Sequence, residues 1–101
     1  MEKTAYTRKW ITADILSFEK GTEHYEGLKA IRLNSEKYKL LIMSDYLPMI
    51  GELKGDMILV PAEGKEILYR NVSGFYRHSR NEFEFILKER FDGRETGGGD
   101  R

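Results

Sequence analysis

Glycine and proline interrupt this chain so often that few segments are long enough for a stable helix. Between Trp10 and Gly93, the two residue types stand at positions 21, 27, 48, 51, 55, 61, 64, 74 and 93. An isolated helix needs about a dozen uninterrupted residues, whereas a strand is complete in about five or six. The spacing therefore predicts a fold built mainly from short strands.

Apolar segments of strand length occupy the intervals between these breaks. They are Leu28–Leu33, Lys39–Met43, Met57–Val60, Glu66–Val72, Phe75–His78 and Phe83–Leu87. The run Lys39–Met43 is continuous, which is typical of a strand buried on both faces. Phe83, Phe85 and Leu87 alternate with the charged residues Glu82, Glu84 and Lys88, which predicts one buried and one solvated face. Ala62–Gly64 predicts a hairpin turn.

Periodicity leaves two segments open between helix and strand. In Trp10–Phe18 and in Asn81–Phe91, apolar residues recur three or four positions apart as well as in strand alternation. From the residues alone, the predicted fold is mostly β, a sandwich or barrel of about seven or eight strands. An α+β fold with one terminal helix is the alternative.

The chain has room for one domain, and its composition excludes several classes of function. We predict a folded unit at residues 10–93 between flexible tails at 1–9 and 94–101, which are polar. Lys and Arg total 17, as do Asp and Glu, so a purely electrostatic grip on nucleic acid is not expected. There is no cysteine, which excludes disulfides and thiolate chemistry. No apolar run approaches the roughly 20 residues of a membrane span, so direct membrane insertion is not expected.

No set of residues has the spacing of a catalytic or metal site. His24 stands between Glu23 and Glu26, but the other histidine, His78, is distant in sequence and has no partner at ligand spacing. Ser73 precedes a glycine but lacks the glycine two positions earlier that a nucleophile elbow needs. We therefore expect a non-enzymatic protein without metal or cofactor.

Two segments carry signals for binding. Aromatic and basic residues mix in Phe75–Arg80, as in small β-barrels that bind single-stranded nucleic acid, but strand alternation divides them between two faces. The segment Met43–Ile50 follows a predicted strand and is unusually apolar for a turn. It is either a loop that caps the core or an exposed contact loop for a protein partner, and the residues alone do not decide between the two.

Several short motifs resemble, in the same order, the N-terminal domain of the ATP synthase epsilon subunit, which is called delta in mitochondria. Tyr46-Leu47-Pro48-Met49 followed by Leu53-Lys54-Gly55 resembles the His-Ala-Pro-Leu … Leu-Lys-x-Gly segment of that family. The other matching segments are Ala13–Ser17, Tyr25–Leu28, Val72–Phe75 and Phe83–Leu87.

The resemblance implies an all-β fold, a flattened β-sandwich of about eight to ten short strands, and it makes both ambiguous segments strands. The chain ends before the family's C-terminal helical hairpin, so neither its inhibitory role nor its ATP binding is expected. Tyr46 replaces the family's histidine. Tyr38-Lys39 replaces a Gly-Glu pair, which reverses the charge.

The function that the resemblance implies is a structural coupling subunit of the central stalk of a rotary ATP synthase, or a shortened paralogue. Its partners would be the gamma subunit and the c ring, bound through Lys39, Tyr46, Leu47, Pro48 and Met49. It would be a monomer when isolated, cytoplasmic, and peripheral to the inner membrane through the complex. The alternatives are a free-standing β-sandwich interaction module or a small single-strand nucleic-acid-binding domain that uses Tyr76, Arg77 and Arg80.

Overall fold

A computed structural model describes residues 10–88, which form six strands and no helix. The strands are β1 (Ile11–Ser17), β2 (Gly21–Ser35), β3 (Lys39–Met43), β4 (Met49–Pro61), β5 (Ile67–Ser79) and β6 (Glu82–Leu87). All-β architecture is therefore confirmed for this part of the chain. Residues 1–9 and 89–101 lie outside the described residues, so the predicted tails and the limit at residue 93 stay untested.

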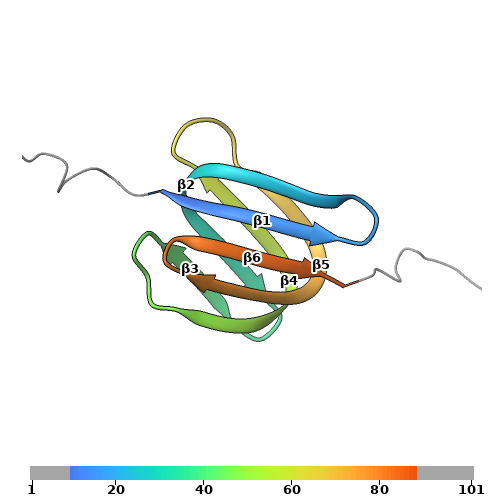
Figure 1. Cartoon of the computed structure of the whole chain (residues 1–101). Helices are drawn as coiled ribbons and strands as arrows, with labels where there is room; N and C mark the ends of the chain where they lie inside the picture. The colour runs from blue at the N-terminus through green and yellow to red at the C-terminus, as the bar shows by residue number, and fades with distance from the viewer. Residues whose placement is uncertain (1–9, 89–101) are drawn as a thin grey trace, which may run out of the picture.

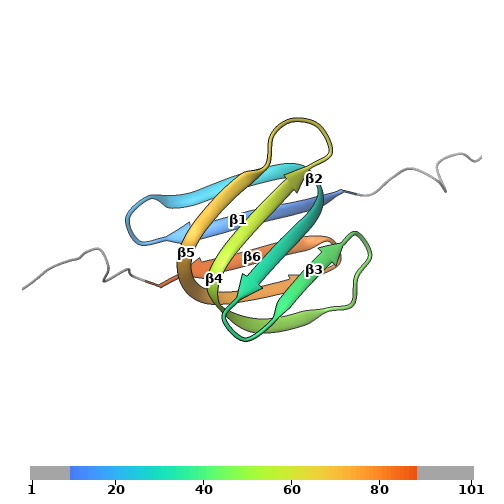
Figure 2. The ribbon, with the colours of Figure 1, turned by 180° about the vertical axis from the view of Figure 1, so that it is seen from behind.

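The sheet closes on itself because β1 pairs with two strands. It runs antiparallel to β2 and parallel to β6, and the order continues through β5 and β4 back to β2. Five strands thus form a closed barrel, with β1 and β6 side by side in Figure 1 and β4 beside β2 in Figure 2. Closure leaves no open edge among the paired lengths of these strands.

The sixth strand, β3, is attached outside the closed barrel. β2 pairs with β4 along Leu28–Ser35, and its opposite edge pairs first with β1 and then with β3. β3 therefore lies in line with β1 on one edge of β2 (Figure 2). The predicted burial of the Lys39–Met43 strand on both faces is wrong for the described residues, because its outer residues Leu41 and Met43 are about half exposed. The first half of β4 has β5 on one edge and no strand on the other.

The expected sandwich of eight to ten short strands is not confirmed, and the strand count was wrong for the described residues. Gly27, Gly51, Gly55 and Gly74 do not end strands but lie inside β2, β4 and β5, which have 15, 13 and 13 residues. Two of these glycines allow close approach of backbone. A Cβ at Gly55 would overlap the Asn34 carbonyl oxygen, and one at Gly74 would overlap that of Ile86. At these positions glycine lets the backbones of neighbouring strands approach closely and bend, and the strands continue past it.

Both segments that periodicity left open are strands. In β1, Ile11, Ala13 and Ile15 point inward and are buried, whereas the residues between them are partly exposed. In β6, Phe83 and Phe85 are buried in the same alternation. Pairing of β1 with β6 gives both strands an apolar interior to face, which overrides their helical spacing.

The barrel interior is filled by aliphatic and aromatic side chains from all six strands. The fully enclosed cluster comprises Ile11, Ala13, Ile15, Leu28, Ile31, Leu33, Ile42, Leu53, Met57, Leu59, Val72, Tyr76, Phe83 and Phe85. The rings of Tyr76 and Phe83 stack with centroids 5.8 Å apart. Burial of such side chains contributes about 1.5–3 kcal/mol each, so this cluster is the main source of stability.

One polar side chain lies inside this apolar interior. His78 of β5 is 0% exposed, and neither ring nitrogen has a hydrogen-bond partner. Its ring is tilted against Phe83 at 6.5 Å, and Met49 of β4 is its register partner on the other side. Burial lowers the pKa of the imidazole below its ordinary value of 6.5, because the charged form would lose its hydration.

The buried imidazole predicts that the protein is less stable in mild acid. Below pH 6.5 the unfolded chain binds a proton at His78 that the folded barrel excludes. The free energy of unfolding therefore decreases as the pH is lowered. The slope is at most about 1.4 kcal/mol per pH unit. Urea denaturation between pH 7.5 and 5.5 measures it.

The control for this prediction is His78→Leu, which removes the buried titrating group. His24, whose pKa is raised, acts in the opposite direction, so both proteins are compared in a His24→Gln background. An equal loss of stability in the two proteins would show that His78 is not the source.

The close approach at Gly74 gives a second prediction. Gly74→Ala places a methyl group against the Ile86 carbonyl oxygen and the Phe85 ring, so β5 and β6 must separate locally. We expect a loss of about 3 kcal/mol in the free energy of unfolding, near the upper end for overpacking. The neighbouring Ser73→Ala is the control, and thermal or urea denaturation measures both. A neutral Gly74→Ala would show that the strands can shift freely.

Candidate protein-contact surface

The apolar loop between β3 and β4 is exposed. Tyr46, Leu47 and Pro48 all face solvent, and Leu47 is 75% exposed. Met49, the first residue of β4, is partly buried and packs against the core. Of the two interpretations that the sequence left open, the structure therefore favours an exposed loop, with Met49 as its anchor.

The loop is tied to the turn between β5 and β6. The Asp45 backbone N–H donates to Asn81 Oδ1 at 2.6 Å, and Asn81 Nδ2 donates to Asp45 Oδ1 at 3.1 Å. Both residues have positive φ, 64° and 63°, a conformation that Asn and Asp tolerate better than most residues. A further bond from the Tyr46 N–H to the Met43 carbonyl closes the turn at 3.2 Å. The loop is thus held in one conformation by polar contacts at its base.

Exposed apolar side chains continue from the loop onto the adjoining strands. Ile50 of β4 is 80% exposed, and Phe75 of β5 lies opposite Ile86 of β6, both about half exposed. We call Tyr46, Leu47, Pro48, Ile50, Phe75 and Ile86 the contact surface. It covers the side of the barrel formed by the first half of β4, the second half of β5, and β6 (Figure 1).

Ion pairs alternate with the apolar side chains of the contact surface, since the register places Arg77 beside Ile50 and Glu52 beside Phe75. Arg77 binds Glu84 at 2.8 Å, and Lys88 binds Glu52 at 3.3 Å. The Lys88 ammonium also lies 4.9 Å from the centre of the Phe75 ring. Protein–protein interfaces combine apolar side chains with polar groups of this kind. Single exposed apolar residues are common on proteins, but a contiguous group indicates an interaction site.

The structure does not bring Lys39 together with the other predicted site residues. Lys39 begins β3 and is exposed, whereas the loop follows the other end of that strand. Five residues of strand span roughly 13 Å between their first and last Cα atoms, so one small partner patch cannot easily contact both. If both contact partners, they contact different ones or different parts of one.

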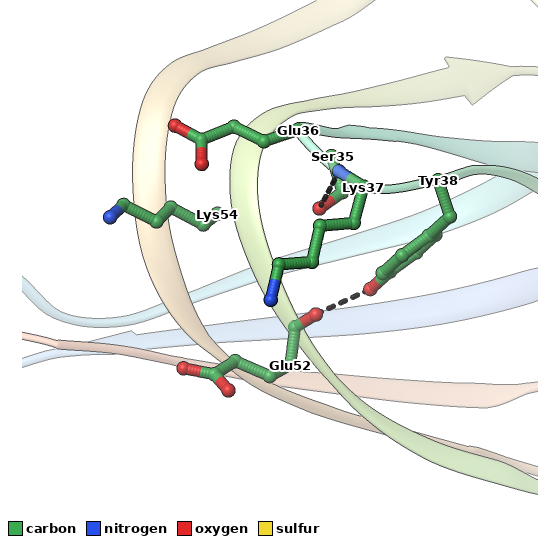
Figure 3. A pocket seen from close by; sticks show the side chains of 6 residues that line it. All are labelled: Ser35, Glu36, Lys37, Tyr38, Glu52 and Lys54. Atoms are coloured by element: carbon green, nitrogen blue, oxygen red, sulfur yellow. Dashed lines mark hydrogen bonds between the residues drawn. The ribbon is translucent and has the colours of Figure 1, made fainter.

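A shallow cavity of about 180 Å³ lies beside Lys39, where the β2–β3 turn meets the first half of β4. Its lining residues are Ser35, Glu36, Lys37, Tyr38, Glu52 and Lys54 (Figure 3). The Tyr38 hydroxyl donates to the Glu52 carbonyl and lies 3.2 Å from the Tyr76 hydroxyl. The Glu36 N–H donates to the Lys54 carbonyl at 3.1 Å. These bonds join β4 to the turn before β3.

The charges around this cavity do not make a ligand site. Two lysines and two carboxylates balance, and Glu52 is already paired with Lys88 outside it. In Figure 3, the Glu52 carboxylate and the Lys54 side chain extend away from the Tyr38 hydroxyl. Burial is the main cause that raises the pKa of Tyr76, with its contact to Tyr38 second, so the Tyr76 phenol stays protonated. The cavity is the gap that remains where the turn before β3 packs against β4.

The charged cluster around His24 lies on the outer surface. His24 Nδ1 is 2.5 Å from Asp14, and Nε2 is 3.0 Å from Glu26. The bond to Asp14, then that to Glu26, raises the pKa of the ring, which favours an imidazolium between two carboxylates. Among residues 10–88, no group of three or more acidic, histidine or cysteine side chains is arranged to hold a metal ion.

A second pair of phenols lies at the far end of the barrel interior. The Tyr69 hydroxyl donates to Glu23 and lies 2.7 Å from the Tyr25 hydroxyl. Burial, then the bond to Glu23, raises the pKa of Tyr69, so this phenol is a donor and not a base. The arrangement satisfies polar groups at the barrel mouth and carries no catalytic geometry.

The residues of the nucleic-acid alternative are not assembled on one surface. Tyr76 is buried in the core, Arg77 is paired with Glu84 on the outside, and Arg80 lies in a turn. The predicted division of this segment between two strand faces is confirmed for residues 75–78. A stacking platform for bases needs aromatic rings beside free cations, and these positions do not supply one.

Sequence reasoning included Ile50 in the candidate contact segment Met43–Ile50, but it did not join Phe75 or Ile86 to that segment. Alternation already placed Phe75 and Arg77 on the same side of a strand, but it could not say which side is outside. Phe75 and Ile86 become neighbours only through the β5–β6 register. No helix among the described residues is long and apolar enough to cross a membrane.

The fold is similar to that of a chain in a mitochondrial ATP synthase. A chain of the central stalk and c-ring structure of the mitochondrial ATP synthase from Tetrahymena thermophila matches with a TM-score of 0.62 at 15% sequence identity. The match covers 89% of this chain and 78% of that chain. No protein-family model and no curated protein matches the sequence. At this identity the match shows a shared fold.

The two hydrogen bonds between Asp45 and Asn81, which we call the clamp, give a third prediction. Asn81→Gly keeps the positive φ available while removing both side-chain bonds to Asp45. We expect residues 44–48 to become mobile and the Asp45 amide to exchange hydrogen at least tenfold faster, with little change in the core amides. NMR hydrogen exchange measures this. Unchanged exchange at Asp45 would mean that packing of Met49 alone holds the loop.

Proposed function

We propose that this chain is a non-catalytic structural subunit of the central stalk of a rotary ATP synthase, or a shortened paralogue of one. The observation that carries the proposal is the fold shared with a chain of the central stalk and c-ring structure of the Tetrahymena enzyme. The collinear motifs that resemble the epsilon subunit support the finer assignment. The exposed loop at Tyr46–Pro48, where that family has its His-Ala-Pro segment, agrees with it.

In this proposal the gamma subunit covers the contact surface. Leu47 and Ile50 are the apolar anchors, because they are the most exposed aliphatic residues of the surface. Tyr46 and Pro48 add rigid area, and the clamp at Asp45 limits the entropy lost on binding. Such a joint suits the transmission of torque, because a close-packed barrel with a fixed loop deforms little under load.

Lys39 is the proposed contact to the c ring. It stands where the family has an acidic residue, and it is exposed at the opposite end of β3 from the loop. A cation at this position requires an acidic partner loop. The separation of Lys39 from the contact surface is compatible with one protein that touches two neighbours, and the whole would be peripheral to the membrane that holds the ring.

The second candidate function is a free-standing protein-interaction module that has left the motor. The reversed charge at Lys39 and the tyrosine at position 46 favour it, since both depart from the family's contact residues. Such a module would keep the contact surface and lose affinity for the gamma subunit. The same binding experiment therefore separates the two candidates.

The experiment is binding of the purified chain to the purified gamma subunit of the same organism. Leu47→Ser with Ile50→Ser removes the two most exposed anchors of the surface. We expect the dissociation constant to rise at least tenfold while the thermal midpoint stays within about 2 °C, because neither side chain is in the core. Calorimetry or surface plasmon resonance measures the affinity.

The matched control is Leu68→Ser, which removes an exposed leucine outside the contact surface. It should leave binding to the gamma subunit unchanged. No binding by the wild-type chain would favour the free-standing module. If Leu68→Ser weakened binding to the gamma subunit as much as Leu47→Ser with Ile50→Ser does, the contact surface would not be the binding site.

A further inference from the structure

The buried imidazole of His78 lies where three strand ends meet beside the loop at residues 44–48, which we call the contact loop. His78 is near the end of β5, and its register partners are Met49, the first residue of β4, and Phe83, the second residue of β6. Met49 directly follows the contact loop. Asn81, which binds the other end of the loop, follows His78 by three residues. The ring is therefore connected to both ends of the contact loop.

No charged group inside the barrel stabilises a protonated His78 ring. Its inward-facing neighbours come from four strands and include no carboxylate; they are Met49 of β4, Tyr76 of β5, Phe83 of β6 and Ala13 of β1. Charged side chains of the same strand segments take outward positions; they are Asp14, Glu52, Arg77, Glu82 and Glu84. A charge on the enclosed ring would lose its hydration without a compensating partner, so the ring must reach water to bind a proton.

The start of β4 is the least firmly attached of the strand segments that enclose the ring. At this level β5 pairs with β4 and β6, and β6 pairs with β5 and β1, so both are held on two edges. Residues 49–54 of β4 pair with β5 alone. Met49 is partly exposed and packs against the core, so it separates the ring from solvent. Displacement of Met49 therefore hydrates the ring at the cost of the fewest strand bonds.

We propose that protonation of His78 displaces Met49 and the start of β4, so that mild acid frees one end of the contact loop while the barrel stays closed. Closure is kept because β4 from Gly55 onward remains paired with β2. The clamp still holds the other end of the loop. Leu47 and Ile50 lie on either side of Met49 in the chain, so only the neutral form fixes their relative positions.

This switch is a property of the chain itself and does not depend on which protein binds the contact surface. Any partner that needs both Leu47 and Ile50 in their neutral-pH arrangement binds more weakly in acid, because part of its binding energy is used to reorder the loop. The test below uses the isolated chain, so its result is separate from that of the gamma-subunit experiment.

Hydrogen exchange measured by NMR detects the opening. The Glu52 carbonyl points away from β5, since it accepts the bond from the Tyr38 hydroxyl. Alternation along an antiparallel strand then directs the N–H groups of Met49 and Gly51 toward β5. Exchange of these two amides therefore reports separation of β4 from β5 beside the ring. Met57 and Leu59, where β4 pairs on both edges, are the reference amides for the core.

We expect the Met49 and Gly51 amides to be less protected than the reference amides at pH 7.5, and their protection factors to fall about tenfold at pH 5.5. This ratio follows if the ring stays neutral in the closed form and titrates at its ordinary pKa of 6.5 in the open form. All proteins carry His24→Gln, because the raised pKa of His24 acts in the opposite direction.

His78→Leu is the matched control, and His78→Phe is a second variant that keeps an apolar ring at this position. In either variant the protection of Met49 and Gly51 should be the same at both pH values. The proposal is overturned if the protein with His78 shows no fall at these amides, or if the fall persists without the histidine. It is also overturned if the two amides are as protected as Met57 and Leu59, because the ring would then reach water only when the whole barrel unfolds.

Discussion

The pairing of β1 with two strands is the interaction on which the rest of the structure depends. Without it, β2 and β6 would each have an open edge, and the interior residues Ile11, Ala13 and Ile15 would have no counterpart. Closure turns a curved sheet into an enclosed core. It also fixes the turn between β5 and β6, because the Thr12 N–H donates to the Asn81 carbonyl at 2.9 Å. The contact loop is then built on that turn.

Closure also explains why so many apolar side chains stay outside. The narrow interior accepts one face of every strand, and the opposite face must project outward. At Ile50 and Phe75 on one side, and at Leu41 and Leu68 on another, that outer face is apolar. A barrel selected only for solubility would carry polar residues there. Apolar residues therefore lie on the surface as well as in the core, and groups of exposed apolar residues are typical of proteins that bind other proteins.

Much of the fold could be predicted from residues, and the remainder depended on register. The alternation in Phe83–Leu87 and the turn at Ala62–Gly64 are local patterns, and both agree with the structure. The length of β4 was not predictable, because a glycine such as Gly55 occurs both in turns and where the backbones of two paired strands approach closely. Only the neighbouring Asn34 carbonyl shows which of the two it is.

Part of the candidate site was also predictable from local sequence, and the rest depended on strand pairing. The loop at Tyr46–Pro48 was visible as an apolar segment around a proline, since composition is a local property. Phe75 and Ile86 could not be joined to it, because their proximity arises from pairing between β5 and β6. Resemblance supplied the names of the expected partners, and the predicted strand Lys39–Met43 already placed Lys39 and the loop at its opposite ends, as the structure does.

The attachment of β3 by a single edge has a consequence for how the molecule responds to strain. Its ladder bonds to β2 can break without opening the closed barrel, since β1, β6, β5, β4 and β2 remain joined. The strand is fastened at its start by the Tyr38 hydroxyl and at its end by the bonds between Asp45 and Asn81. Separation of β3 from β2 would leave the barrel closed but would expose Ile42, which is fully buried in the core.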